Sequence, residues 1–167
     1  MKKIVVLLES LFEKSELIYP YHRLREDFDV VLVGSEKYVE YPSKAGYKVK
    51  SDIISKEAYP SEFDGVYIPG AYSPDGMRKH EATINFVKKF HENGKSIAAV
   101  CHGPWVVSDA GLLDGVKASS TPTIKKDLIN AGAKWEDREV VVYNNIITRR
   151  SPKDLPAHVK AFVDALK

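Results

Sequence analysis

Short apolar runs alternate with amphipathic segments along most of the chain. Four runs rich in β-branched residues are typical of buried strands: 3–8, 28–33, 65–70 and 96–100. Five segments with apolar positions at helical spacing are predicted helices: 15–27, 81–93, 104–110, 123–130 and 155–166. Strands that alternate with helices in this way predict an α/β protein with a mostly parallel sheet and helices on both faces.

Two further segments are predicted β-hairpins. Residues 39–49 alternate weakly around Pro42 and Gly46, and residues 140–148 form two apolar runs that flank Asn144 and Asn145. Asparagine tolerates the left-handed backbone that tight hairpin turns require. No repeat, low-complexity segment or linker divides the sequence, so a single domain over residues 1–167 is expected.

Composition narrows the class of protein. The hydrophobic share of 44% and the charged share of 29% are those of a globular domain, and a net charge of +2 is too small to indicate a nucleic-acid or membrane partner. The apolar run after Lys3 stops at Glu9, too early for a signal peptide, and no run is long enough to span a membrane. One cysteine excludes an intramolecular disulfide and fits a reducing compartment. We therefore expect a cytoplasmic protein.

The single cysteine occupies a position that suggests chemistry. Cys101 directly follows a predicted strand and precedes a helix that begins near Pro104, which is the layout of a nucleophile elbow. Ala99 and Gly103 are small enough to allow a sharp turn, and the N-terminus of the next helix is expected to stabilise a thiolate. The alternative is that Cys101 is a small buried apolar residue.

Two other segments are expected at the same edge of the sheet. If the strand before Gly70 and Ala71 neighbours the cysteine strand, amides of this turn and of His102 could form an oxyanion hole, although an ordinary turn is equally consistent with the sequence. Glu13 and Glu16 follow the first strand. A protonated Glu16 beside the sulfur would lower the pKa of the thiol, whereas its plainer interpretation is an acid in the first turn of a helix.

Other cofactor chemistry lacks support in the sequence. Four histidines are dispersed without metal-ligand spacing, and surface or hydrogen-bonded roles are expected for them: His22, His80, His91 and His158. Neither a Gly-x-Gly-x-x-Gly motif nor a phosphate-binding loop occurs, so no cofactor is predicted. Trp105 and Trp135 are interpreted as packing residues, and Trp105 could also shape the pocket wall beside Cys101.

Several of these segments together resemble the PfpI intracellular protease family. They are Glu16–Leu24, Pro69-Gly70, Ala99–Pro104, Ile124–Gly132 and the region of Trp135, so the resemblance spans nearly the whole chain. The wider superfamily includes ThiJ-like proteins, the parkinsonism-associated deglycase, glyoxalase III enzymes and class I glutamine amidotransferases. The resemblance implies a flavodoxin-like three-layer sandwich in which Cys101 is the nucleophile, Glu16 hydrogen-bonds the sulfur and His102 is the base.

The resemblance also implies an oligomer. An acid from a neighbouring subunit orients the histidine in this family, and Asp75 matches its position, so a homodimer or hexamer would complete the site. Because His102 follows Cys101 directly, its side chain should point away unless the turn folds it back. The sequence departs from the family pattern at Ala71 for glycine, at Asp75 for glutamate and at Thr121 for tyrosine. The Ala71 change puts one oxyanion amide in doubt, because a positive φ is needed there.

Three functions are compatible with these residues. The first is attack of Cys101 on reactive carbonyls such as methylglyoxal or its early adducts (a deglycase or glyoxalase III-like activity), or on peptide bonds as in a cysteine peptidase. The second is a non-catalytic sensor of oxidative stress that uses the same sulfur. The third, a glutamine amidotransferase subunit, is weak because His158-Val159-Lys160 lacks the acid of the required His-x-Glu pair. Small carbonyls or peptides are thus the expected substrates.

Overall fold

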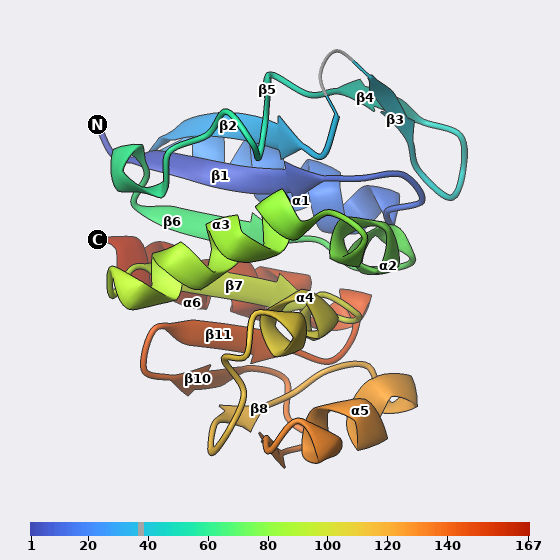
Figure 1. Ribbon diagram of the computed structural model, residues 1–167, viewed down its shortest axis with the longest axis vertical. Coiled ribbons are helices and arrows are strands. Elements are labelled where there is room, and N and C mark those ends of the chain that lie inside the picture. The colour runs from blue at the N-terminus through green and yellow to red at the C-terminus, as the bar shows by residue number, and fades with distance from the viewer. Residues whose placement is uncertain (37–38) are drawn as a thin grey trace.

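The computed structural model describes residues 1–36 and 39–167, and a seven-stranded sheet runs through its middle (Figure 1). The strand order is β10-β11-β7-β6-β1-β2-β5, and every neighbouring pair is parallel except β10 with β11. The strands of this sheet are β1 (Lys3–Leu8), β2 (Asp29–Gly34), β5 (Ile53–Ile54), β6 (Gly65–Ile68), β7 (Ser96–Val100), β10 (Val141–Tyr143) and β11 (Ile146–Arg149). The predicted mostly parallel sheet is confirmed.

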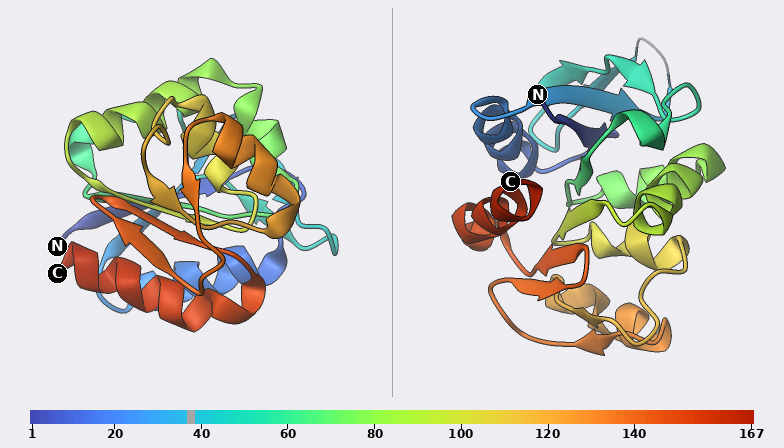
Figure 2. Two further views of the ribbon diagram at one scale, coloured as in Figure 1. Left: turned by 90° about the horizontal axis from the view of Figure 1, so that it is seen from below. Right: turned by 90° about the vertical axis from the view of Figure 1, so that its left-hand side faces the viewer.

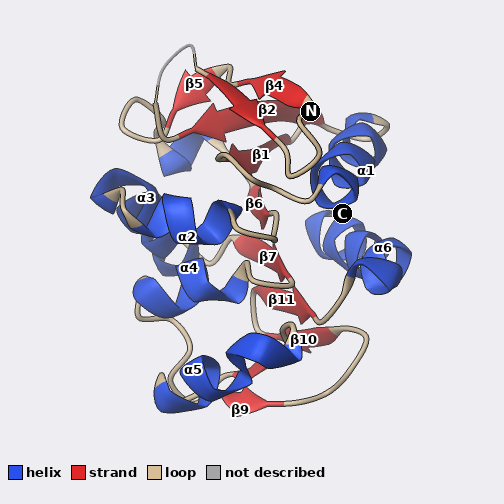
Figure 3. Ribbon diagram, turned by 90° about the vertical axis from the view of Figure 1, so that its right-hand side faces the viewer, coloured by secondary structure: helices blue, strands red, loops and turns tan. Residues whose placement is uncertain are grey.

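Helices cover both faces of the sheet, which gives three layers (Figure 3). One face carries α1 (Lys14–Arg25) and α6 (Leu155–Leu166), and the other carries α2 (Ser73–Arg78), α3 (Glu81–Glu92) and α4 (Pro104–Asp109). A small unit of α5 (Lys125–Asn130), β8 (Lys117–Ala118) and β9 (Lys134–Trp135) lies beyond the β10 edge (Figure 1). The helix predicted over 123–130 is shorter, because Pro122–Ile124 forms a 3₁₀ turn before α5.

Each face of the sheet has its own hydrophobic core, because the central strands are buried on both sides. Val5, Val66 and Ile97 point toward α3 and α4, whereas alternate residues such as Val6 and Tyr67 point toward α1 and α6. The strands therefore read as continuous apolar runs. Within the part of the chain described here, no helix is long and apolar enough to cross a membrane.

Both predicted hairpins are confirmed. β3 (Glu40–Pro42) pairs antiparallel with β4 (Lys48–Lys50), and the β10–β11 turn has Asn144 at a φ of 52°. The β3–β4 hairpin packs on the loop after β1, where Leu11 N donates to Pro42 O at 2.7 Å and Lys44 N donates to Phe12 O at 3.0 Å. This contact brings the hairpin to the carboxyl edge of the sheet. Figures 1 and 2 show both chain termini together at the opposite edge.

Candidate functional site

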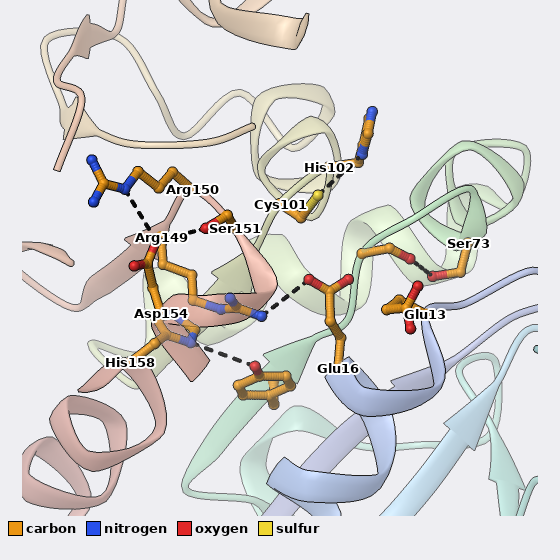
Figure 4. A network of polar contacts seen from close by, with 12 residues as sticks. Glu13, Glu16, Ser73, Cys101, His102, Arg149, Arg150, Ser151, Asp154 and His158 are labelled. Carbon is orange, nitrogen blue, oxygen red and sulfur yellow. Dashed lines mark hydrogen bonds and ion pairs between the residues drawn. The ribbon is translucent and has the colours of Figure 1, made fainter. Parts of the chain in front are cut away.

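Four neighbouring strands deliver polar groups to one edge of the sheet (Figure 4). β11 ends at Arg149, β7 is followed by Cys101, β6 is followed by Gly70 and Ala71, and β1 leads into α1 with Glu16. The carboxyl edge of a parallel sheet is where α/β proteins build their sites, because loops from adjacent strands converge there. The sequence-predicted residues therefore meet because β7, β6 and β1 are adjacent.

The backbone at Cys101 forms a sharp turn. Cys101 has a φ of 59°, its N–H donates to Arg149 O at 3.2 Å, and Gly103 N–H donates to Val100 O at 2.7 Å. A Cβ on Gly103 would lie 2.8 Å from the Ile68 carbonyl oxygen and from the Val100 nitrogen, so only glycine fits. The left-handed conformation is costly for a residue with a side chain, and such strain is concentrated at functional sites. The strand–turn–helix layout predicted for a nucleophile elbow is present.

The turn after β6 packs directly against this elbow. A Cβ on Gly70 would lie 2.7 Å from Glu16 Oε1 and 2.8 Å from Cys101 Cβ, so the missing side chain lets the carboxyl group and the cysteine approach each other. Ala71 has a φ of 58°. The expectation that alanine here loses the positive-φ conformation is therefore wrong, because the surrounding structure holds Ala71 in it. The Ala71 amide faces Cys101 and lowers the pKa of its thiol.

Glu16 is fully buried and is paired with an arginine that the sequence did not reveal. Its Oε2 accepts from Arg149 Nη2 at 3.0 Å, and both side chains are almost completely removed from solvent. Among the described residues Glu16 Oε1 has no hydrogen-bond partner. Burial raises the pKa of Glu16 to about 7, against the lowering effect of the Arg149 charge. Glu16 does lie in the first turn of α1, as its plainer interpretation expected, but its side chain points into the protein instead of into solvent.

The thiol of Cys101 is not stabilised as a thiolate in the way expected from the next helix. Burial first, and the negative charge of Glu16 second, raise the pKa of Cys101 to about 11, although the Ala71 and His102 amides act against this. Cys101 and Glu16 therefore share one proton over the range between about 7 and 11. Within that range a thiolate exists when the proton lies on Glu16.

His102 is folded back toward the sulfur. Its Nδ1 lies 3.4 Å from Cys101 Sγ, and its Nε2 lies 3.4 Å from Thr123 Oγ1. The ring meets Trp105 edge to face, with centroids 5.2 Å apart. Burial lowers the pKa of His102, so the neutral imidazole, which can accept a proton, is the prevailing form near pH 7.

A pocket of about 420 Å³ opens over these groups. Its lining residues are Glu13, Glu16, Lys44, Ala71, Tyr72, Cys101, His102, Thr123 and Pro152. Lys44 comes from the β3–β4 hairpin and lies 3.6 Å from Glu13. Trp105 does not line the pocket, contrary to expectation. It supports the His102 ring from behind, and its Nε1 donates to Asp127 Oδ2 at 2.9 Å.

Asp75 lies apart from the other predicted residues. It is exposed on α2 and borders a second depression with Glu9, Lys79 and His80. No contact joins its side chain to His102 within the described part of one chain. The Nε2 atom of His102 contacts Thr123 Oγ1 instead. The placement of Asp75 beside a histidine of another subunit stays a prediction.

Sequence reasoning missed Arg149, Thr123 and Lys44. For Arg149 a signal existed, because a charged residue directly follows the buried run 146–148 and so falls at the carboxyl edge of the sheet. Thr123 and Lys44 belong to loops that only the tertiary structure brings to the pocket. No spacing in the sequence connects them to Cys101.

Together these features define an α/β protein with a cysteine elbow at the carboxyl edge of its sheet. The family model described as "DJ-1/PfpI family" matches residues 2–165. A protein named deglycase from Pyrococcus abyssi is 43% identical over 165 residues, which cover 99% of each chain. The chain belongs to the DJ-1/PfpI family.

Two further comparisons agree. The Bacillus subtilis protein YraA is provisionally named as a cysteine protease. It is 42% identical to this chain over 167 residues, with 99% of each chain covered. A crystal structure from Anabaena variabilis, of a protein with DJ-1/ThiJ/PfpI-like and ferritin-like domains, superposes with a TM-score of 0.98 at 41% identity. That match covers 99% of this chain and 48% of the other, so this chain spans about half of the two-domain protein. The family and these named relatives make the chain a cysteine-dependent enzyme of the deglycase and protease class.

Proposed function

We propose that the chain converts reactive carbonyl compounds, with methylglyoxal and its early adducts as the substrate class and Cys101 as the nucleophile. The observation that carries this proposal is the arrangement around one sulfur. Glu16 and His102 both lie beside Cys101 at the base of a pocket about the size of a small molecule. The name deglycase, which a relative at 43% identity carries, supports the same class.

The reaction with methylglyoxal balances without a cofactor. The Cys101 thiolate adds to the aldehyde carbon, and the carbonyl oxygen takes a proton, which gives a hemithioacetal. The hydrogen on this carbon then moves to the neighbouring ketone carbon, so that the first carbon is oxidised to a thioester and the second is reduced to an alcohol. Water cleaves the thioester and gives lactate and the free thiol.

The site offers a group for each of these steps. Glu16 can accept and return the migrating proton, because its Oε1 is unpartnered among the described residues and its pKa is about 7. The amides of Ala71 and His102 face the reacting centre and can stabilise negative charge on the substrate oxygen. His102 Nδ1, at 3.4 Å from the sulfur, can take the thiol proton.

Peptide cleavage is the second candidate, and the Ala71 backbone is what favours it. An oxyanion hole is needed for a tetrahedral intermediate, and Ala71 keeps the positive φ that orients its amide toward Cys101. The name of the Bacillus subtilis relative points the same way. A peptide also needs a proton donor for the leaving amine, which His102 could supply after it takes the thiol proton.

The test measures lactate from methylglyoxal without added thiol. We expect release by the wild type, a loss of at least about 10³-fold in Cys101→Ala, and a loss of about 10²-fold or more in Glu16→Gln. Ser108→Ala, on α4 but outside the pocket lining, is the matched control and should keep the wild-type rate. Equal rates in wild type and Cys101→Ala would refute the proposal. A peptide library assayed with the same variants tests the second candidate.

We further propose that the working form is a homo-oligomer in which Asp75 of one subunit approaches His102 of another. Asp75 is exposed on α2, so a second chain can reach it. His102 lines the same pocket, and its Nε2 contacts Thr123 Oγ1 at a long 3.4 Å, which leaves room for a stronger acceptor. The family resemblance suggests this assignment.

A further inference from the structure

Arg149 is a buried cation paired with Glu16, the carboxyl group that lies beneath the proposed nucleophile. Its side chain is completely shielded from solvent, and its one charged partner among the described residues is Glu16, at 3.0 Å. Arg149 Nε and Nη1 have no hydrogen-bond partner in the same part of the structure. Burial of a charge is costly unless an opposite charge compensates it, so Arg149 requires a negative charge close by.

The groups around Arg149 leave few sources for that charge. Tyr67 and His158, on β6 and α6, are both fully buried on the same face of the sheet. Burial raises the pKa of Tyr67 and lowers that of His158 to about 3, so both side chains are neutral at pH 7. His158 Nε2 donates to Ile147 O at 3.1 Å, which leaves Nδ1 as the acceptor facing the Tyr67 hydroxyl at 3.5 Å.

The remaining charged groups face Glu16 from the pocket side. Glu13 and Lys44 lie at the mouth of the pocket, are each more than a third solvent-exposed and pair with one another at 3.6 Å. They compensate each other and are screened by water. His102 is neutral near pH 7 because burial lowers its pKa. The charge opposite Arg149 must therefore come from Glu16 or from Cys101.

The sheet fixes Arg149 in this position. Arg149 pairs with Val100 in the β11–β7 register, and its carbonyl oxygen accepts the Cys101 N–H at 3.2 Å. Figure 4 shows its guanidinium reaching across to the Glu16 carboxylate, which in turn lies beneath the cysteine. The same residue thus holds the elbow by its backbone and the carboxyl group by its side chain.

We propose that Arg149 is a positioning residue that serves as counter-ion to the single negative charge shared by Glu16 and Cys101, and that it thereby sets the pH at which the nucleophile becomes available. When both acids are protonated, Arg149 is a buried cation without a counter-charge. Loss of one proton removes that imbalance, whether the proton leaves from oxygen or from sulfur. Arg149 therefore favours the state that contains the reactive thiolate at neutral pH. The effect of Arg149 on turnover rests on the proposed function, but its effect on the ionisation of Cys101 can be measured without any substrate.

The test is the pH dependence of Cys101 alkylation by iodoacetamide, which reacts with the thiolate at the one cysteine of the chain. In the wild type we expect a first rise in rate with a midpoint near pH 7, where the Glu16–Cys101 pair loses its first proton, and a second rise near pH 11. Arg149→Met should move the first midpoint upward by about one unit or more, so that alkylation at pH 7 slows about fivefold or more, while Arg149→Lys should restore most of the shift. Arg150→Met is the matched control, because Arg150 pairs with Asp137 and Asp154, lies outside the pocket lining and should leave the profile unchanged.

A second pair of variants covers the case in which Arg149→Met does not fold. In Glu16→Gln the shared charge can lie only on sulfur, and no buried carboxylate is left without its partner when Arg149 is removed. The midpoint for Glu16→Gln/Arg149→Met should therefore lie about one unit above that for Glu16→Gln. Equal midpoints in this pair, or in folded Arg149→Met and wild type, would overturn the proposal. A shifted midpoint in a protein that produces no lactate would support it and refute only the proposed substrate.

Discussion

The charge state of single residues in this protein depends on their burial more than on their residue type. His158 shows this in the core beneath α1 and α6, where it is completely enclosed and hydrogen-bonded to the Ile147 carbonyl. Its pKa is lowered from 6.5 to about 3, because burial disfavours the imidazolium. A histidine with a depressed pKa contributes stability above its unfolded-state pKa, and that contribution is lost as the pH falls from about 6.5 toward 3.

The lowered pKa of His158 gives a prediction about the stability of the protein at acid pH. His158→Gln cannot be protonated, so its free energy of unfolding should fall less than that of the wild type between pH 6.5 and pH 4, by roughly 3 kcal/mol. Glu16 titrates in the same range with the opposite sign, but it is present in both proteins and cancels in the comparison. Urea unfolding at each pH measures the difference. His22→Gln, on the exposed side of α1, should track the wild type, and an identical slope for His158→Gln would contradict the prediction.

At the scale of elements, the two turns that follow β6 and β7 carry the strain of the site. Both have a residue with a side chain in the left-handed region, Ala71 at a φ of 58° and Cys101 at 59°. The glycines beside them, Gly70 and Gly103, let the two turns pack without a Cβ between them. The turns thus cost local conformational energy, which the packing of the adjacent strands offsets.

The Ala71 turn can be tested by relieving the strain. Ala71→Gly removes a left-handed penalty of about 1–2 kcal/mol, and the greater freedom of glycine in the unfolded chain offsets about half of that. We expect thermal unfolding to show a gain of about 0.5–1 kcal/mol. Ala161→Gly in the middle of α6 is the matched control and should lose about 1 kcal/mol, because that position is helical. A loss of stability in Ala71→Gly would show that the Ala71 methyl group packs productively.

At the scale of the whole molecule, a single chain brings Cys101, Glu16 and His102 together, whereas Asp75 lies apart from them. If a partner's Asp75 completes the site, Cys101→Ala and Asp75→Ala subunits should each be inactive alone but complement each other when mixed. Refolding the two in equal amounts should recover about a quarter of the wild-type lactate-forming rate in a dimer. Asp109→Ala, an exposed acid on α4, replaces Asp75→Ala in the control mixture. Failure to recover activity in mixed oligomers of verified composition would place Asp75 outside the site.

The hydrophobic pattern alone determined the order of the main elements. Continuous apolar runs such as Lys3–Leu8 arise because a strand in a parallel sheet is buried on both faces, and Leu155–Leu166 was predicted at its observed bounds from its helical spacing. Cys101 was found because a cysteine between a strand and a helix is a local signal. Short elements such as β5, α2, β8 and β9 escaped prediction, since two to six residues carry too little periodicity.

Only the tertiary structure decided the chemistry of the site. Strand order placed Arg149 next to the Cys101 turn, although 48 positions separate them in the printed sequence, and the hairpin brought Lys44 to the pocket. The conformation of Ala71 and the pKa values of Glu16 and Cys101 depend on burial and on charges contributed by distant segments. Local patterns are set by neighbours along the chain, whereas electrostatics and strain are set by neighbours in space, which is why the sequence by itself determined the elbow but not the state of its sulfur.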